Sequence, residues 1–132
     1  MTTHTISLNC PRMIGKVPWG LLSLNAERKL HWSARKAVAA YWRSNTETAV
    51  RMAGIPPMGR VHVVVYFHKA TNRMYDVSNL LPVAKSCVDG MVDAGIIEDD
   101  NNNFLIGPDM RAGAKSTTPH IRIEITCLGD PE

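Results

Sequence analysis

The sequence of 132 residues lacks the features that mark several protein classes. Its three cysteines, Cys10, Cys87 and Cys127, are far apart and form no CxxC pair, which argues against a disulfide framework and a zinc site. No apolar run approaches the roughly 20 residues that a membrane-spanning helix needs. The N-terminus has no charged segment followed by an apolar one, so we expect no secretory signal and a cytoplasmic protein with reduced thiols.

Motifs for common cofactors are also missing. No GxGxxG or P-loop pattern occurs, so no nucleotide cofactor is expected. The five histidines have neither HExxH nor another paired spacing, which argues against a zinc centre. What remains is an ordinary globular composition, 45% hydrophobic and 20% charged. We therefore expect residues 1–132 to form a single domain.

Charge is distributed unevenly along the chain. Residues 1–70 carry ten Lys and Arg against two Asp and Glu, whereas residues 71–132 carry five against ten. A basic half suggests an acidic partner, usually nucleic acid, although a lopsided solvated surface is an alternative. Six carboxylates gather around a single lysine, Lys85, in "MYDVSNLLPVAKSCVDGMVDAGIIEDDNNN". Such crowding costs stability unless a cation, for example a metal ion, neutralises it.

Hydrophobic periodicity predicts a β-α-β-α-β-β order. Alternating side chains predict strands in residues 3–10, 60–68, 101–110 and 119–128. A period of 3.6 predicts helices in residues 33–53 and 79–94, and the Pro- and Gly-containing residues 11–20 are expected to form a loop. The order predicts an α+β fold, in which a small mixed β-sheet carries both helices on one face.

The two helices differ in their polar faces. The first is expected to turn its arginines and lysines away from an apolar face that comprises Ala34, Val38, Tyr41, Trp42, Ala49 and Met52. At its start, Trp32 either stacks on nucleic acid with His31 or acts as a hydrophobic staple. The second helix is expected to begin with Ser78 or Asn79 as N-cap.

Carboxylates lie at both ends of the second helix. Asp76 precedes it, and Asp99 and Asp100 follow it. A helix over residues 79–94 would span about 24 Å, so Asp76 and Asp100 meet only if the chain doubles back. Aspartates in such a set resemble the oxygen ligands of Mg²⁺.

An alternative interpretation of these carboxylates involves no metal ion. Asp76 would then simply start the helix, and residues 98–103 would form a solvated turn. Lys85 and Asp89 are four residues apart and would form a surface ion pair.

The segment "DVSNLLPVAKSCVDGMVDAGIIEDD" resembles the signature of the RusA family of Holliday junction resolvases, which are common in phages and prophages. The matching residues are Asp76, Asn79, Leu80, Lys85, Asp89, Gly90, Gly95, Asp99 and Asp100. In addition, "LNAERKLHW" looks like a substrate-contacting segment of the phage members. The resemblance extends from about Leu24 to Leu128.

This resemblance implies a RusA-like fold and a homodimeric, Mg²⁺-dependent endonuclease that nicks symmetric strands of a four-way DNA junction, with Mn²⁺ as a substitute metal. It implies Asp76, Lys85 and Asp100 as catalytic residues. The implied metal ligands are Asp76, Asp99 and Asp100, with Asp89 as a further carboxylate and Ser78 and Asn79 in support. With the basic helix face, it implies DNA contacts by Asn25, Arg28, Lys29, His31, Arg35, Lys36, Arg43 and Arg73.

The chain departs from the family pattern at two points. Ser78 stands where the pattern has an aspartate, so one carboxylate is missing, and three extra residues precede Lys85. Lys85 lies seven residues after Ser78 and so stays on the same helical face. Two other functions remain open: a junction-binding protein with weak or lost catalysis, and a dimeric α+β module whose acidic turn binds a protein.

Overall fold

The computed structural model describes residues 2–131, and its main sheet has four strands in the order β1-β6-β4-β5. The strands are β1 (Thr3–Asn9), β4 (Arg60–His68), β5 (Leu105–Ala112) and β6 (His120–Gly129). β6 is antiparallel to both β1 and β4, whereas β5 pairs parallel to β4. The sheet is therefore mixed, as the sequence predicts.

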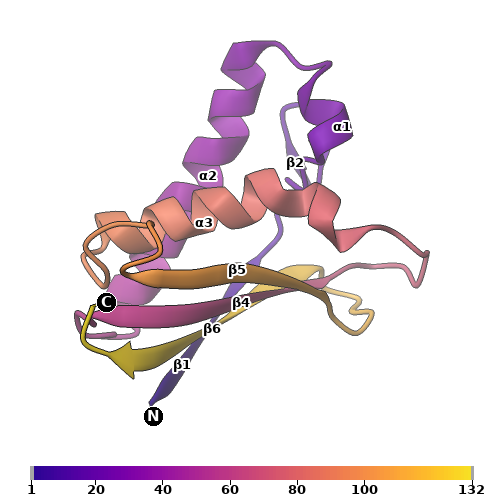
Figure 1. Cartoon of the computed structure of the whole chain (residues 1–132). Helices are drawn as coiled ribbons and strands as arrows, with labels where there is room; N and C mark the ends of the chain where they lie inside the picture. Colours follow the sequence, from indigo (N-terminus) through magenta and orange to yellow (C-terminus); the bar gives the residue numbers. More distant parts are fainter. Residues whose placement is uncertain (1, 132) are drawn as a thin grey trace.

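Two long helices, α2 (Trp32–Met52) and α3 (Leu81–Asp93), cover one face of this sheet (Figure 1). A short helix α1 (Leu24–Glu27) and a 3₁₀ turn η1 (Val77–Leu80) precede them. Figure 1 shows α2 running past α3 and away from the sheet, with α1 beside its far end. The α+β class is confirmed, and the six predicted elements occur in the predicted order, with the strands β2 and β3 and the helix α1 in addition. No helix within residues 2–131 is long and apolar enough to cross a membrane.

The core lies between the sheet and the two helices. Alternate residues of the central strands β4 and β6 point into it and are fully buried, namely Val61, Val63, Val65, Phe67, Ile121, Ile123 and Ile125. The helices contribute Trp42, Val50, Val83, Cys87 and Met91 from the other side. Burying each such side chain contributes about 1.5–3 kcal/mol, so the period-2 pattern of the strands explains why they occupy the centre.

The two long helices are in close contact at Gly90. A Cβ atom placed on Gly90 would clash with the carbonyl oxygen of Arg43 and would lie 2.9 Å from Cβ of Thr46. No larger side chain fits without moving backbone. This contact fixes the crossing of α2 and α3 and brings Arg43 next to the C-terminal half of α3.

The predicted loop over residues 11–20 is wrong in part. Strands β2 (Met13–Ile14) and β3 (Val17–Pro18) pair as a small hairpin. Gly15 occupies its turn with φ of 55°. Two-residue hairpin turns need positive φ, which glycine adopts without strain.

The buried face of α2 also differs from the predicted one. Its buried residues, Val38, Trp42, Thr46 and Val50, are spaced by four. A row of such spacing drifts by about 40° at each step around a helix with 3.6 residues per turn. A fixed helical-wheel face misses this drift, and Met52, predicted to be on the apolar side, is 84% exposed.

The third predicted strand begins later than expected. β5 starts at Leu105, whereas Asn101 to Asn103 form a turn. The side chain of Asn101 accepts a hydrogen bond from the backbone N–H of Asn103 at 2.9 Å. Such local bonding favours turns over strands.

Candidate active site

The helix start is built by Asp76. Its Oδ1 accepts hydrogen bonds from the Ser78 backbone N–H at 3.0 Å and from the Ser78 hydroxyl at 2.6 Å. The predicted N-cap at Ser78 or Asn79 is therefore wrong. Asp76 caps η1, and α3 begins only at Leu81. The two hydrogen bonds hold the pKa of Asp76 below its ordinary value, so this carboxylate is ionised at neutral pH.

Lys85 brings two carboxylates together on the exposed side of α3. Its Nζ lies 3.3 Å from Oδ1 of Asp89 and makes a closer contact with Oδ2 of Asp100. The Asp89 contact is the i,i+4 pair expected from spacing. Asp100 reaches the lysine because the chain doubles back after α3. Within this loop, Oδ1 of Asp99 accepts a hydrogen bond from the Asp100 N–H at 2.8 Å.

The predicted metal ligands do not all converge. Within residues 2–131, no group of three or more His, Cys, Asp or Glu side chains is arranged to hold a metal ion. The Asp76 carboxylate accepts a hydrogen bond from the Ser78 hydroxyl at the start of the helix, whereas the Lys85 ammonium links Asp89 and Asp100. The pair Asp89 and Asp100 nevertheless supplies two hard oxygen donors. Mg²⁺ usually takes one or two carboxylates from a protein and completes its shell with waters and phosphate, and these two carboxylates are donors of the chemical type that it takes.

Arg43 of α2 has a partner that the sequence did not indicate. Its Nε lies 2.5 Å from Oδ2 of Asp93, and its Nη2 lies 2.8 Å from Oδ1. This bidentate pair holds the pKa of Asp93 below its usual range. Asp93 lies 50 residues further along the chain, so no spacing rule could have paired the two. Arg43, predicted to bind DNA, therefore also ties α2 to α3.

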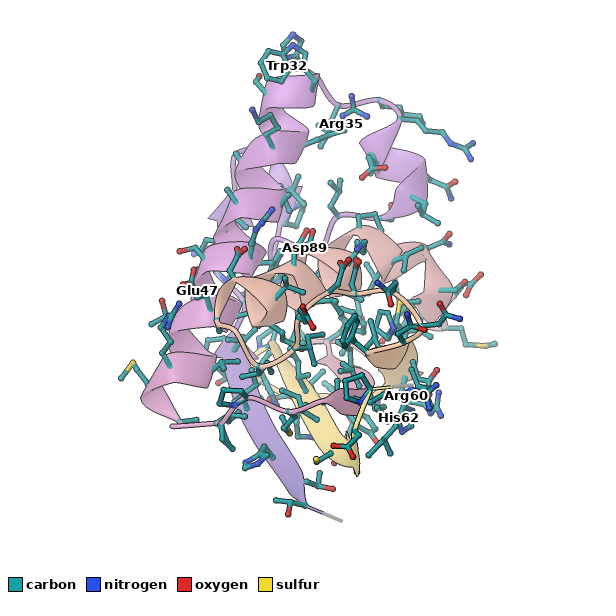
Figure 2. The ribbon with its side chains drawn as sticks, turned by 60° about the vertical axis from the view of Figure 1, so that its left-hand side comes forward. Trp32, Arg35, Glu47, Arg60, His62 and Asp89 are labelled. Atoms are coloured by element: carbon teal, nitrogen blue, oxygen red, sulfur yellow. The ribbon has the colours of Figure 1, made fainter. Side chains whose placement is uncertain are left out.

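Two open grooves run along α2 and share Lys36 and Ala39 as lining residues. The groove beside α3 has a volume of about 220 Å³ and is lined by Lys36, Ala39, Ala40, Arg43, Ser86 and Asp89. The groove at the far end has about 340 Å³ and is lined by Glu27, Trp32, Arg35, Lys36 and Ala39. Figure 2 shows Trp32 and Arg35 at the far end of α2 and Asp89 on α3. We call these two grooves together the α2 track.

The other predicted DNA contacts lie around this track or beside η1. Asn25 is exposed on α1, which packs beside η1, and Arg28 and Lys29 are exposed in the turn after α1. His31 caps α2, with Nδ1 accepting a hydrogen bond from the Ser33 N–H at 3.2 Å. Arg73 is exposed in the loop that leads to Asp76. Within residues 2–131, no ion pair is formed by Arg28, Lys29, Arg35, Lys36 or Arg73.

The fold thus brings the basic N-terminal half of the chain against the acidic segment. Lys36 and Arg43 from α2 line the same groove as Asp89 from α3. Asp89 and Asp100 in turn share one lysine. Sequence reasoning did not single out Glu27 and Ser86, which also line the track.

Comparison with known proteins gives little further information. No family model matches the chain. A protein of Xylella fastidiosa described as "Uncharacterized protein" is 30% identical over 88 residues, which cover 63% of this chain and 58% of that protein. The chain therefore spans less than two thirds of the length of this relative, to which it is similar over part of its sequence.

Proposed function

We propose that this protein is a Mg²⁺-dependent endonuclease that resolves four-way DNA junctions by paired symmetric nicks and acts as a homodimer, in the manner of RusA-type resolvases. The observation that carries the proposal is the position of the Lys85–Asp89–Asp100 cluster. It lies on the exposed side of α3, and Asp89 also lines a groove with Lys36 and Arg43. A carboxylate cluster beside a cation-lined groove suits a reaction at a DNA phosphate.

Asp89 and Asp100 would hold the metal ion, with Asp76 and Asp99 as the further carboxylates that the sequence resemblance implies. When bound, Mg²⁺ or Mn²⁺ supplies positive charge to a phosphodiester and lowers the pKa of a water molecule. Lys85 orders the two carboxylates and provides a cation for the negative charge that develops on a phosphate oxygen. Ser78 holds the Asp76 carboxylate in one orientation, and Asn79 follows on the same turn.

Cations without ion-pair partners would bind the DNA backbone. Arg28, Lys29, Arg35, Lys36 and Arg73 are exposed and can replace counterions on phosphates, with Asn25 and His31 nearby. Contacts of this kind give affinity and orientation without reading bases. Junction shape would then select the substrate, in the cytoplasm of a bacterial host cell.

A second candidate function is junction binding without cutting. It is favoured by the engagement of Asp76, whose carboxylate oxygen accepts two hydrogen bonds from Ser78, the residue that replaces an expected aspartate. The lack of a three-carboxylate group within residues 2–131 favours it as well. Both candidates use the same basic surface and differ only in catalysis.

Cleavage of a labelled four-way junction distinguishes the two. We expect wild type to nick the junction only when Mg²⁺ or Mn²⁺ is added. Asp100→Asn should lower the rate by about 10²-fold or more, because changes even to the hydrogen-bond partners of metal ligands typically cost about 10- to 100-fold, while junction affinity is retained. Glu98→Gln is the matched control, because it removes the same charge at a neighbouring exposed position. Binding without nicks at any metal concentration would instead support the second candidate.

A further inference from the structure

Trp32 is placed unlike the other two tryptophans. Trp42 is fully buried and donates its Nε1–H to the Gly20 carbonyl at 2.8 Å, and Trp19 is partly buried. Trp32 is 57% exposed at the first turn of α2, the end farthest from the sheet (Figure 2). It is therefore not a core residue, and as the first residue after the N-cap it does not stand at the N′ position of a hydrophobic staple. Lys36 lies over the ring, and more than half of the side chain is exposed.

A lysine and a histidine ring lie beside this indole. The Lys36 Nζ lies 5.3 Å from the centroid of the Trp32 ring, and the His31 ring lies 5.7 Å away on the N-terminal side. Arg35 and Lys36 follow Trp32 by three and four residues, so they project from the same side of the helix. All three line the groove of about 340 Å³ at the far end of the α2 track, where Glu27 is the one acidic lining residue among residues 2–131.

We propose that Trp32 is a stacking site for an unpaired nucleobase, with Arg35 and Lys36 binding the phosphates on either side of it. The identity of the ligand as DNA rests on the proposed function. The charge argues for this occupant, because a nucleotide offers both an aromatic face for the indole and an anion for the two cations. A base inside a duplex has both faces covered by its neighbours, so the site takes bases that are unstacked at a branch point, gap or single strand.

The geometry of α2 links this site to the carboxylate cluster. From Trp32 to Arg43, which borders the groove beside Asp89, the helix rises by about 17 Å, or about five stacked nucleotides of one strand. A strand lying in the α2 track would therefore place an unpaired base on Trp32 while a phosphate about five nucleotides away reaches the cluster on α3.

The test compares two single-stranded probes without divalent metal, so that it does not depend on cutting. One probe is an oligothymidine of about 12 nucleotides, and the other is the same backbone with abasic residues. We expect oligothymidine to quench the emission of the exposed tryptophan in the full chain. Trp32→Leu should lose about tenfold or more in affinity for oligothymidine and bind the abasic probe as wild type does. Trp32→Phe, which keeps an aromatic face, should retain most of the affinity.

Met52→Ala is the matched control, because Met52 is an exposed apolar residue at the other end of the same helix. It should bind both probes as wild type does, and far-ultraviolet circular dichroism should show that all variants fold. Equal affinity of wild type and Trp32→Leu for oligothymidine would overturn the inference. So would an equal loss on both probes, or failure of wild type to bind oligothymidine.

Junction cutting separates this inference from the proposed function. Wild type that stacks oligothymidine on Trp32 but never nicks a junction would contradict the nuclease and leave the stacking site in place. Wild type that nicks junctions, while Trp32→Leu binds oligothymidine normally, would contradict the stacking site alone.

Discussion

The two halves of α2 carry the same kind of charge but use it differently. In the C-terminal half, Arg43 pairs with Asp93 and Arg51 pairs with Glu47. In the N-terminal half, Arg35 and Lys36 have no ion-pair partner within residues 2–131. Figure 1 shows the C-terminal half packed beside α3 and the N-terminal half extending past it.

This difference distinguishes cations that are already paired within the fold from cations that are free to bind a phosphate. An arginine that donates hydrogen bonds from two of its nitrogens to one carboxylate already has an electrostatic partner. Binding a phosphate would require breaking that pair. A solvated lysine or arginine holds only mobile counterions, which a phosphate displaces at little cost. A count of basic residues on a helix face therefore overestimates the DNA-binding surface, and the location of the acidic partners corrects it.

The largest effect should come from removing the unpaired cations. We expect Arg35→Ala/Lys36→Ala to lower junction affinity at least roughly a hundredfold at about 50 mM salt and to reduce the slope of log K against log salt by about two for each protomer, or about four for the homodimer. Stability should change by no more than about 0.5 kcal/mol. Fluorescence anisotropy with a labelled junction over a salt series measures both quantities.

Arg43→Ala/Arg51→Ala is the matched control for that experiment, because it removes the same charge from the C-terminal half. It should leave the salt slope nearly unchanged. If the two double variants flatten the slope equally, the comparison between the two halves fails.

Next in size is the effect of filling the helix crossing. Gly90→Ala places a methyl group against the Arg43 carbonyl and Thr46, and we expect it to lower the free energy of unfolding by about 1–3 kcal/mol. Urea unfolding measures this change. Ser44→Ala, at an exposed position of α2, the other helix of this crossing, should change stability little. A Gly90→Ala protein as stable as wild type would show that the helices can separate here at no cost.

A smaller effect is expected for the Arg43–Asp93 pair itself. The pair is partly exposed, with 51% and 29% of the two side chains accessible, so Arg43→Ala should cost about 0.5–1 kcal/mol in unfolding free energy. A double-mutant cycle with Asp93→Ala isolates the pair energy. A coupling energy of zero would mean that the pair contributes no stability and that the Arg43 guanidinium is free to bind a phosphate.

The smallest effect is a pH dependence. Arg43 lowers the pKa of Asp93 in the folded state below the unfolded value of about 3.9. The stabilising contribution of Asp93 is therefore fully present above about pH 4 and is lost as the pH falls through the lowered folded-state pKa. We expect the stability difference between wild type and Asp93→Asn to be constant from pH 7 to 5 and to shrink below pH 4. A difference that does not change down to pH 2.5 would contradict this assignment.

Much of the fold follows from local pattern. Alternating side chains predicted β4, in which Val61, Val63, Val65 and Phe67 are fully buried, and the period of 3.6 residues predicted the helix α3 that covers them. Local pattern failed where several polar residues compete for one role. Asp76, Ser78 and Asn79 are all good N-caps, and only the backbone path through η1 selects Asp76.

The sequence predicted which residues make up the candidate site better than it predicted how their side chains pair. Spacing gave the Lys85–Asp89 pair, and the approach of Asp100 required only that the chain return along α3. The pairing of Arg43 with Asp93 depends on the crossing of two helices, which no local rule supplies. The exposure of Trp32 likewise depends on how far α2 extends past the rest of the fold.

The most direct test of the account is to map nicks made by the wild-type protein on a four-way junction and on a linear duplex of the same arm sequence, with and without Mg²⁺. The account predicts nicks at symmetric positions in two opposite strands of the junction, only with the metal, and none in the linear duplex. A junction that is bound but intact at every Mg²⁺ concentration would contradict the claim that the Lys85–Asp89–Asp100 cluster forms a nuclease site.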